Sequence, residues 1–216
     1  MNITELARSL EDLKDAETLN LTREVLAEGH PPKEVLLRGL CAGMDRVGER
    51  YARREYFVPD MLRASQIFNQ ALAILEPLLA RDPAEPFARG AIGVVKGNTQ
   101  DNGKNIVRIL LRANGAEVED LGKSVPAEKF VDAARGGADF VGISVMTSGG
   151  VGQARKVVEA LAAEGLRHRV KVLVGGAAVN ERTAADLVGA DGYAADAAAA
   201  VALVRRWFAG EGADHV

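Results

Sequence analysis

The chain has 216 residues, and its 27 lysines and arginines against 30 aspartates and glutamates give a formal net charge of −3. Hydrophobic residues make up 48% and charged residues 26% of it, as in ordinary globular proteins, which excludes a disordered or fibrous chain. A slightly negative charge supplies no field that would hold a phosphate backbone, so nucleic acid is not an expected partner.

The sequence predicts a cytoplasmic protein with no membrane insertion. The N-terminal stretch MNITELARSLEDLKDAE lacks the basic and apolar regions of a signal peptide. No apolar run approaches the ~20 residues that a membrane-spanning helix needs. Cys41 is the single cysteine and the three histidines are scattered, so neither a disulfide nor a zinc site built from side chains is expected.

The first 80 residues predict a helical domain. Apolar residues recur at spacings of three and four, with leucine, alanine, glutamate and arginine prominent. Breaks fall at 29–32 and 56–59. With the weaker segment 2–15 counted as a helix of its own, the stretch contains four helices, which can close an antiparallel bundle. We therefore expect a four-helix domain over residues 1–82. Residues 83–90, with two prolines and no hydrophobic period, are expected to be a linker.

Residues 91–216 predict an α/β domain. Short β-rich runs alternate with helical runs, which is the pattern of a parallel sheet with helices on both faces. The predicted strands are 91–97, 117–121, 140–146, 170–175 and 192–194, and the predicted helices are 104–114, 127–135, 152–163, 181–188 and 197–208. The expected fold is a helical bundle followed by a doubly wound, Rossmann-like or flavodoxin-like domain. In such sheets a ligand binds outside the carboxyl ends of the strands.

Three predicted strand ends are followed by unusual loops. The first, residues 96–105, is polar and opens a helix, yet it contains neither Gly-x-Gly-x-x-Gly nor a P-loop. The second, residues 144–150, combines hydroxyl residues with glycines, which permit close approach of a ligand. The third, residues 175–178, reads Gly-Gly-Ala-Ala and predicts a slot at the edge of the sheet.

Taken together, these loops resemble the cobalamin-binding module of corrinoid proteins that serve methyltransferases, a group that includes the cobalamin module of methionine synthase. That family carries Asp-x-His-x-x-Gly, then Ser-x-Leu roughly forty residues later, then Gly-Gly nearly thirty further on. Here 41 positions separate Gly103 from Ser144, and 29 separate Met146 from Gly175. Residues 43–51 and 55–60 are similar to the helical cap domain that precedes such modules, and residues 189–194 are also similar to the family.

The resemblance implies cobalamin as the cofactor, with its dimethylbenzimidazole tail displaced from cobalt into a slot beside the sheet. It assigns cofactor binding to Asn98, Thr99, Gln100, Asp101, Asn102, Gly103, Ser144, Met146, Thr147, Gly175, Gly176, Ala177 and Tyr193. It places a cap over the upper corrin face, formed by Phe57, Val58, Met61, Leu62 and Ser65.

The cobalt-ligating histidine of the family is absent from this chain. Asn98 and Gln100 stand where the family has its Asp and its His, while Gly103 is retained. Gln100 is long enough to be a weak or water-mediated cobalt ligand, although a neutral amide is a far poorer donor than imidazole. Asn98 could hydrogen-bond the Gln100 amide. Because imidazole stabilises five-coordinate Co(II), its loss should raise the Co(II)/Co(I) potential.

The resemblance implies a methyl carrier that has no turnover alone. Its partners would be a methyltransferase specific for the methyl donor, a methyltransferase for the acceptor, commonly tetrahydrofolate, and a reductive activator. No side chain resembles a general base or nucleophile, so the metal would do the chemistry. Two alternatives are a cobalamin-dependent sensor or regulator, although no basic recognition helix is evident, and a scaffold that has lost its ligand.

Several of these residues also have a structural interpretation. Ser144 could end a strand by bonding its own backbone. Asp101 and Asn102 could cap the following helix. Gly175 and Gly176 could form only a turn, and the apolar cap residues could belong to an ordinary core.

Overall fold

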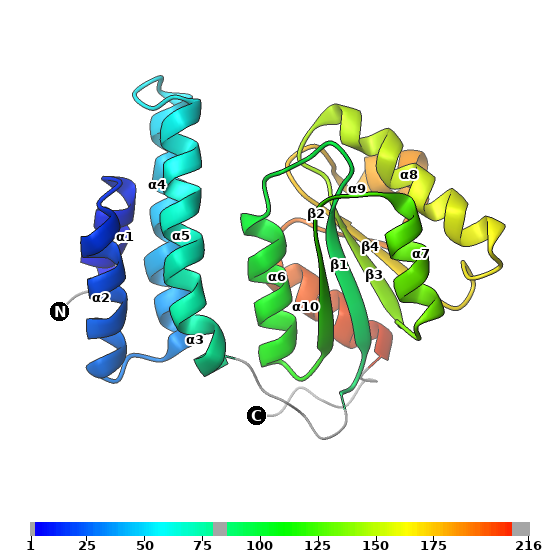
Figure 1. Ribbon diagram of the computed structural model, residues 1–216, viewed down its shortest axis with the longest axis horizontal. Coiled ribbons are helices and arrows are strands. Elements are labelled where there is room, and N and C mark those ends of the chain that lie inside the picture. The colour runs from blue at the N-terminus through cyan, green and yellow to red at the C-terminus, as the bar shows by residue number, and fades with distance from the viewer. Residues whose placement is uncertain (1–2, 80–85, 209–216) are drawn as a thin grey trace. The chain divides into compact units, whose positions relative to one another are not determined.

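The computed structural model describes residues 3–79 and 86–208, and the chain divides into two compact units, Met1–Ala80 and Arg81–Val216 (Figure 1). Residues 83–85 of the predicted linker lie outside the described residues, and residues 86–90 lie within them. The first strand begins at Arg89, two residues before its predicted start. Arg89 joins the sheet because its side chain pairs with Glu117 at 3.1 Å and its N–H donates to Asp139 at 2.7 Å.

The first unit is helical, as predicted. It consists of α1 (Ile3–Glu11), α2 (Asp15–Ala27), a continuous run of α3 (Pro32–Glu34), η1 (Val35–Cys41) and α4 (Ala42–Ala52), and α5 (Val58–Leu79). Its core includes the fully buried Leu6, Leu36 and Phe68. A Cβ on Gly43 would lie 2.9 Å from the Ala7 carbonyl oxygen, so α4 approaches α1 this closely only with glycine there.

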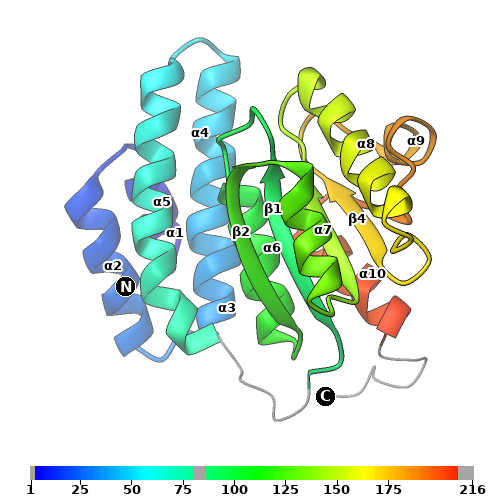
Figure 2. The same cartoon turned by 45° about the vertical axis from the view of Figure 1, so that its right-hand side comes forward.

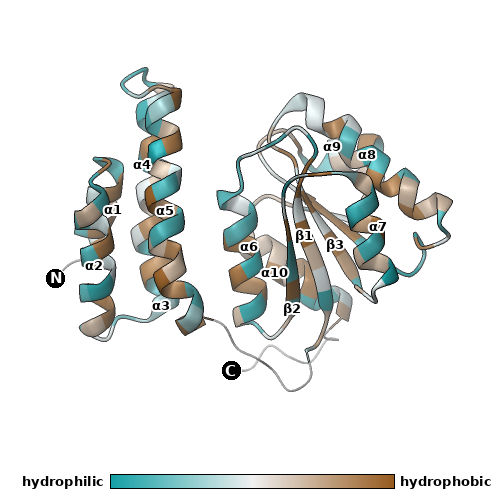
Figure 3. Cartoon of the chain, in the orientation of Figure 1, coloured by the Kyte–Doolittle hydropathy of each residue, from teal (hydrophilic) through white to brown (hydrophobic). Residues whose placement is uncertain are grey.

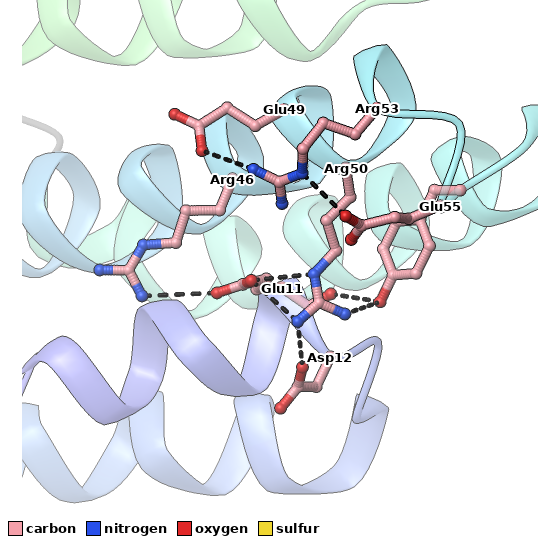
Figure 4. Close-up of polar contacts among 8 residues, drawn as sticks. Glu11, Asp12, Arg46, Glu49, Arg50, Arg53 and Glu55 are labelled. Atoms are coloured by element: carbon pink, nitrogen blue, oxygen red, sulfur yellow. Dashed lines mark hydrogen bonds and ion pairs between the residues drawn. The ribbon is translucent and has the colours of Figure 1, made fainter.

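An ionic network holds the turn between α4 and α5 (Figure 4). Arg50 donates to Glu11 at 2.9 Å, to Asp12 at 3.1 Å and to the Tyr56 hydroxyl at 3.1 Å. That hydroxyl donates in turn to the Glu11 carbonyl oxygen at 2.7 Å. One guanidinium therefore ties the end of α1 to the segment that enters α5.

We expect Arg50→Met to lower the free energy of unfolding by about 1–2 kcal/mol, because it removes three partly shielded hydrogen bonds. Chemical denaturation followed by circular dichroism measures the loss. The control is Arg53→Met. Arg53 pairs with Glu49 and Glu55 on the surface, where ion pairs contribute little, so this variant should unfold like the parent. Equal destabilisation by the two variants would contradict a specific role for Arg50.

Within residues 86–208, the second unit is a five-stranded parallel sheet with helices on both faces (Figure 2). Its strands are β1 (Arg89–Val95), β2 (Glu117–Val125), β3 (Phe140–Ser144), β4 (Lys171–Gly175) and β5 (Gly192–Ala194). Its helices are α6 (Asn102–Ala113), α7 (Ala127–Arg135), α8 (Ser148–Ala163), α9 (Glu181–Thr183), η2 (Ala184–Val188) and α10 (Ala197–Phe208). The spatial order β2-β1-β3-β4-β5 confirms the predicted doubly wound, flavodoxin-like fold.

Two hydrophobic clusters hold the helices to the sheet. One contains Phe130 of α7 and Val157 of α8, and the other contains Leu111 of α6 and Leu203 of α10. Strand β1 is buried along all but its first residue, which explains its continuous apolar sequence. The brown colour of β1 and β3 in Figure 3 marks their hydrophobic residues. Because side chains fill both faces, the strand ends are the part of the sheet that remains accessible to a ligand. None of the described helices is long and apolar enough to cross a bilayer.

Two strands end earlier than predicted. Strand β1 stops at Val95 because Gly97, with a φ of +84°, lies in the turn that follows. Strand β3 stops at Ser144 because the Met146 N–H donates to the Asn98 side chain, at 2.7 Å, and not to a neighbouring strand. The two loops are therefore held by side-chain hydrogen bonds where we expected a strand ladder.

Three other boundaries also differ from the prediction. Helix α6 begins at Asn102 and α8 at Ser148, both earlier than expected. Gly150 allows the first turn of α8 to lie close to the first loop, because a Cβ there would lie 3.1 Å from the Asn98 Oδ1 atom. Strand β2 continues to Val125 and shifts its register against β1 on the way.

Candidate functional site

The candidate site is the edge of the sheet at which β1, β3 and β4 end. Val94, Ser144 and Gly175 lie side by side there in the parallel register. The three loops singled out in the sequence follow these strands and therefore meet at one edge, where doubly wound proteins bind their ligands.

Asn98 ties the first loop to the second. The residue is 4% exposed, and its Oδ1 accepts hydrogen bonds from the N–H groups of Met146 at 2.7 Å and Thr147 at 3.0 Å. Its Nδ2 donates to the Thr147 hydroxyl at 2.9 Å. The suggested hydrogen bond from Asn98 to Gln100 is not found among the described residues. Asn98 instead acts as a buried clamp between two loops.

Gln100 and Thr99 form the exposed tip of the first loop. Neither side chain makes a hydrogen bond to another residue within 3–79 or 86–208. The Gln100 carboxamide offers both a hydrogen-bond donor and an acceptor. The tip therefore presents unpaired polar groups that a ligand at this edge of the sheet could bind.

The rest of this loop leads into α6. Asp101 faces Lys123 at 3.2 Å and makes no side-chain cap to the helix, so its predicted capping role is not seen. Asn102 begins the helix itself. A Cβ on Gly103 would meet no atom within 4 Å, which leaves open space beside the first turn.

The second loop carries the half-buried Ser144 and Met146 and the exposed Thr147. The Ser144 hydroxyl has no hydrogen-bond partner in the part of the chain that the structure describes, so it does not bond its own backbone. The Thr147 hydroxyl is occupied by Asn98. Ser144 is therefore a polar group at the sheet edge that can accept an external partner.

The glycines of the third loop have a packing function. Gly176 has a φ of +113°, and a Cβ there would lie 2.3 Å from the Val145 carbonyl oxygen. A Cβ on Gly175 would lie 2.8 Å from the Ala194 carbonyl oxygen. The pair thus lets the backbone after β4 lie directly against its neighbours. Ala177 beyond it is exposed.

Tyr193 of β5 is half-buried and packs against the hydrophobic cluster that contains Phe130. It pairs with Val174 of β4 in the sheet register, and β4 separates its strand from β3. The structure therefore places it at the same end of the sheet as Gly175, on the neighbouring strand.

The predicted cap residues share one face of α5 within the first unit. Phe57 precedes the helix and is 64% exposed, and Val58 and Leu62 are also exposed. Met61 and Ser65 are half-buried and lie at helical spacings of three and seven from Val58. The interpretation of Phe57, Val58 and Leu62 as ordinary core is wrong, because these side chains reach the surface of the unit.

A buried ion pair below the first loop was not predicted from the sequence. The Lys104 ammonium is 1% exposed and binds the Asp120 carboxylate of β2, which Arg108 also approaches at 3.6 Å. Partial burial acts to raise the pKa of the Asp120 carboxyl, but the hydrogen bonds from Lys104 and the Gly122 N–H, with the two cationic charges, outweigh it. The pKa of Asp120 therefore lies below its ordinary value.

We expect Asp120→Asn to cost about 2–3 kcal/mol of stability at neutral pH, because Lys104 then loses its carboxylate, while the partial exposure of Asp120 limits the penalty. A carboxyl group whose pKa is lower in the folded state than in the unfolded state stabilises the folded protein at pH values above its unfolded pKa of about 4. This stabilisation is lost as the pH falls through the pKa of the folded state. Urea unfolding at several pH values should therefore show the variant and the parent converging in acid. A difference that stays constant with pH would contradict this.

The fold and the site together define a class of protein, in which a helical unit is followed along the chain by a doubly wound unit that binds a cofactor at the carboxyl ends of its strands. Among the described residues, no group of three or more histidine, cysteine, aspartate or glutamate side chains could hold a metal ion. Models of the B12 binding domain match residues 88–202 and residues 3–76. The chain belongs to the family of B12-binding corrinoid proteins that serve methyltransferases, and its cofactor is cobalamin.

Named relatives cover nearly the whole chain. The dimethylamine corrinoid protein 3 of Methanosarcina acetivorans is 37% identical over 93% of this chain and 94% of its own length. The solved structure of the Methanosarcina barkeri monomethylamine corrinoid protein matches with a TM-score of 0.85 and 28% identity, over 94% of this chain and 97% of that one. A chain of the methanol:cobalamin methyltransferase complex from Methanosarcina barkeri shares the fold, with a TM-score of 0.55 and 23% identity, over 96% of this chain and 80% of that one.

Proposed function

We propose that this protein is a methyl carrier that holds cobalamin at the edge formed by β1, β3 and β4, with the nucleotide tail displaced into a slot beside the sheet. The observation that carries the proposal is a pair of polar side chains at this edge, Gln100 and Ser144, without hydrogen-bond partners among the described residues. A Cβ on Gly103 or Gly149 would meet no atom within 4 Å, which leaves room beside both loops. When bound, cobalamin supplies the cobalt that takes up and gives off the methyl group.

The residues of this chain would hold the cofactor without an imidazole below the metal. Gln100 would be a weak ligand or would hold a water molecule, and Asn98 would fix the loop beneath it. The exposed His168 precedes β4 and so lies at the opposite end of the strands, and His30 belongs to the first unit. Ser144 would hydrogen-bond the displaced tail, with Gly176 and Ala177 along it.

We extend the proposal to the domain organisation and the partners. Residues 1–82 would form the cap, with the exposed face of α5 over the corrin, joined by a linker at 83–90 to the cobalamin-binding domain at 91–216. The relatives are named for methylamines, and a chain of the same fold belongs to a methyltransferase complex. The partners would be a methyltransferase specific for the donor, an acceptor methyltransferase that uses tetrahydrofolate, and a reductive activator.

The test is a titration of the purified protein with cob(II)alamin, followed by absorption and EPR spectroscopy. We expect stoichiometric binding and a cobalt signal without nitrogen superhyperfine splitting. After the bound cofactor has been reduced to cob(I)alamin with a low-potential chemical reductant, addition of a methylamine methyltransferase and its substrate should form methylcobalamin on the protein, whereas substrate without the methyltransferase should not. Protein that stays colourless after incubation with hydroxocobalamin would overturn the proposal. A light-driven change of oligomeric state with adenosylcobalamin would point instead to a regulator.

A further inference from the structure

The second half of β2 is irregular in a way that the sequence did not suggest. Its register against β1 shifts twice, between Ile92 and Gly93 and between Gly93 and Val95. Within this stretch Gly122 has a φ of +89° and Ser124 a φ of +50°. Positive φ is uncommon for a residue with a side chain and persists only where the surroundings hold it. Bulges of this kind redirect side chains and occur often beside functional sites.

The irregular stretch binds the loop of residues 97–101, called here the 97–101 loop. The Ser124 hydroxyl accepts a hydrogen bond from the Gly97 N–H at 2.9 Å, and the Ser124 N–H donates to the Asn98 carbonyl oxygen at 3.0 Å. Lys123, the residue before Ser124, pairs with Asp101 at 3.2 Å. Contacts from adjacent residues of β2 therefore hold both ends of the loop.

On its other side, the 97–101 loop is held through its own residue Asn98, whose carboxamide oxygen accepts hydrogen bonds from the N–H groups of Met146 and Thr147 after β3. Between these anchors only Thr99 and Gln100 are left without side-chain hydrogen bonds in the described ranges. A loop that is fixed on both sides and unpaired at its tip is preorganised to present that tip to a ligand.

From these contacts we propose that Ser124 is a positioning residue for Gln100: its positive φ and its two hydrogen bonds set where the tip of the 97–101 loop stands at the sheet edge. The inference rests on the proposed function, because it takes the lower side of a corrinoid to be what Gln100 faces. It adds a residue of β2 to a site that the sequence motifs place on the loops after β1, β3 and β4.

The test compares Ser124→Gly and Ser124→Ala with the parent and with Glu119→Ala. Both substitutions at Ser124 remove the hydroxyl, and glycine also accepts the positive φ without strain, so Ser124→Gly should remain folded. Glu119 is an exposed residue of the same strand whose side chain makes no hydrogen bond to the 97–101 loop in the described structure, and it is the control. Amide hydrogen exchange is measured on the protein without cofactor. Binding and EPR are then measured with cob(II)alamin and with cob(II)inamide, which lacks the nucleotide tail.

We expect the Gly97 amide to exchange at least about 10-fold faster in Ser124→Gly, with protection in the strands unchanged. Both corrinoids should bind several-fold more weakly and show an altered cobalt signal, since the loop lies under the ring and not along the tail. Unchanged exchange at Gly97, or unchanged affinity and signal for both corrinoids, would overturn the proposal. If the parent itself binds neither corrinoid, the proposed function has failed, while the exchange experiment still decides whether Ser124 holds the loop.

Discussion

Gly176→Ala is expected to destabilise the second unit by about 3 kcal/mol or more. The φ of +113° at Gly176 is one that residues with a Cβ rarely adopt, and the new atom would lie 2.3 Å from the Val145 carbonyl oxygen. That oxygen cannot move away easily, because the Val145 N–H donates to the Gly175 carbonyl oxygen at 2.8 Å and the Ala178 N–H donates to Val145 at 3.2 Å. Chemical denaturation measures the loss. Weaker cobalamin binding should accompany it, since the same backbone forms the predicted slot.

Gly149→Ala is the matched control for Gly176→Ala. Gly149 also lies at the ligand edge, but it is in helix α8 and a Cβ there would meet no atom within 4 Å. Because alanine is the better helix former, this variant should be as stable as the parent or more stable by up to about 1 kcal/mol. Parental stability in Gly176→Ala would contradict the close packing of the third loop against Val145.

The glycine pair shows how far a motif can be interpreted without coordinates. The spacing marked Gly175 and Gly176 as unusual, and we expected them to make room for a ligand. The structure adds a second reason for the glycines, because a neighbouring carbonyl oxygen, from Ala194 at Gly175 and from Val145 at Gly176, excludes a side chain. A sequence shows that a side chain is absent at a position. It does not show which atom occupies the space.

The architecture of the second unit was predictable because the hydrophobic pattern of each segment indicates a strand or a helix without reference to distant residues. Strand β1 is a continuous apolar run buried on both faces, and α7 and α10 begin and end at the residues expected. The clamp at Asn98 had no such signal, because its partners Met146 and Thr147 are distant in sequence and meet it only through the register of β1 and β3. The irregularity at Ser124 was hidden for the same reason.

Gln100→His is expected to place a nitrogen donor where the parent offers an amide. With cob(II)alamin bound, the variant should show nitrogen superhyperfine splitting that the parent lacks. If imidazole favours Co(II) over Co(I) by about 10–100-fold, the Co(II)/Co(I) midpoint potential should fall by about 60–120 mV. EPR and a spectroelectrochemical titration of the loaded proteins measure both effects. Gln100→Ala is the control and should show neither.

The surroundings of Gln100 limit what a single substitution can restore. A ligating imidazole normally donates its second N–H to a carboxylate or carbonyl that fixes its orientation. The Asn98 oxygen is already shared by the Met146 and Thr147 N–H groups, so the introduced ring would lack that support. We expect the pair Asn98→Asp and Gln100→His to lower the potential further than Gln100→His alone, because a carboxylate can keep the backbone contacts with one oxygen and accept from the ring with the other. Nitrogen splitting already present in the parent would show that the cobalt has another nitrogen ligand and that Gln100 does not determine its coordination.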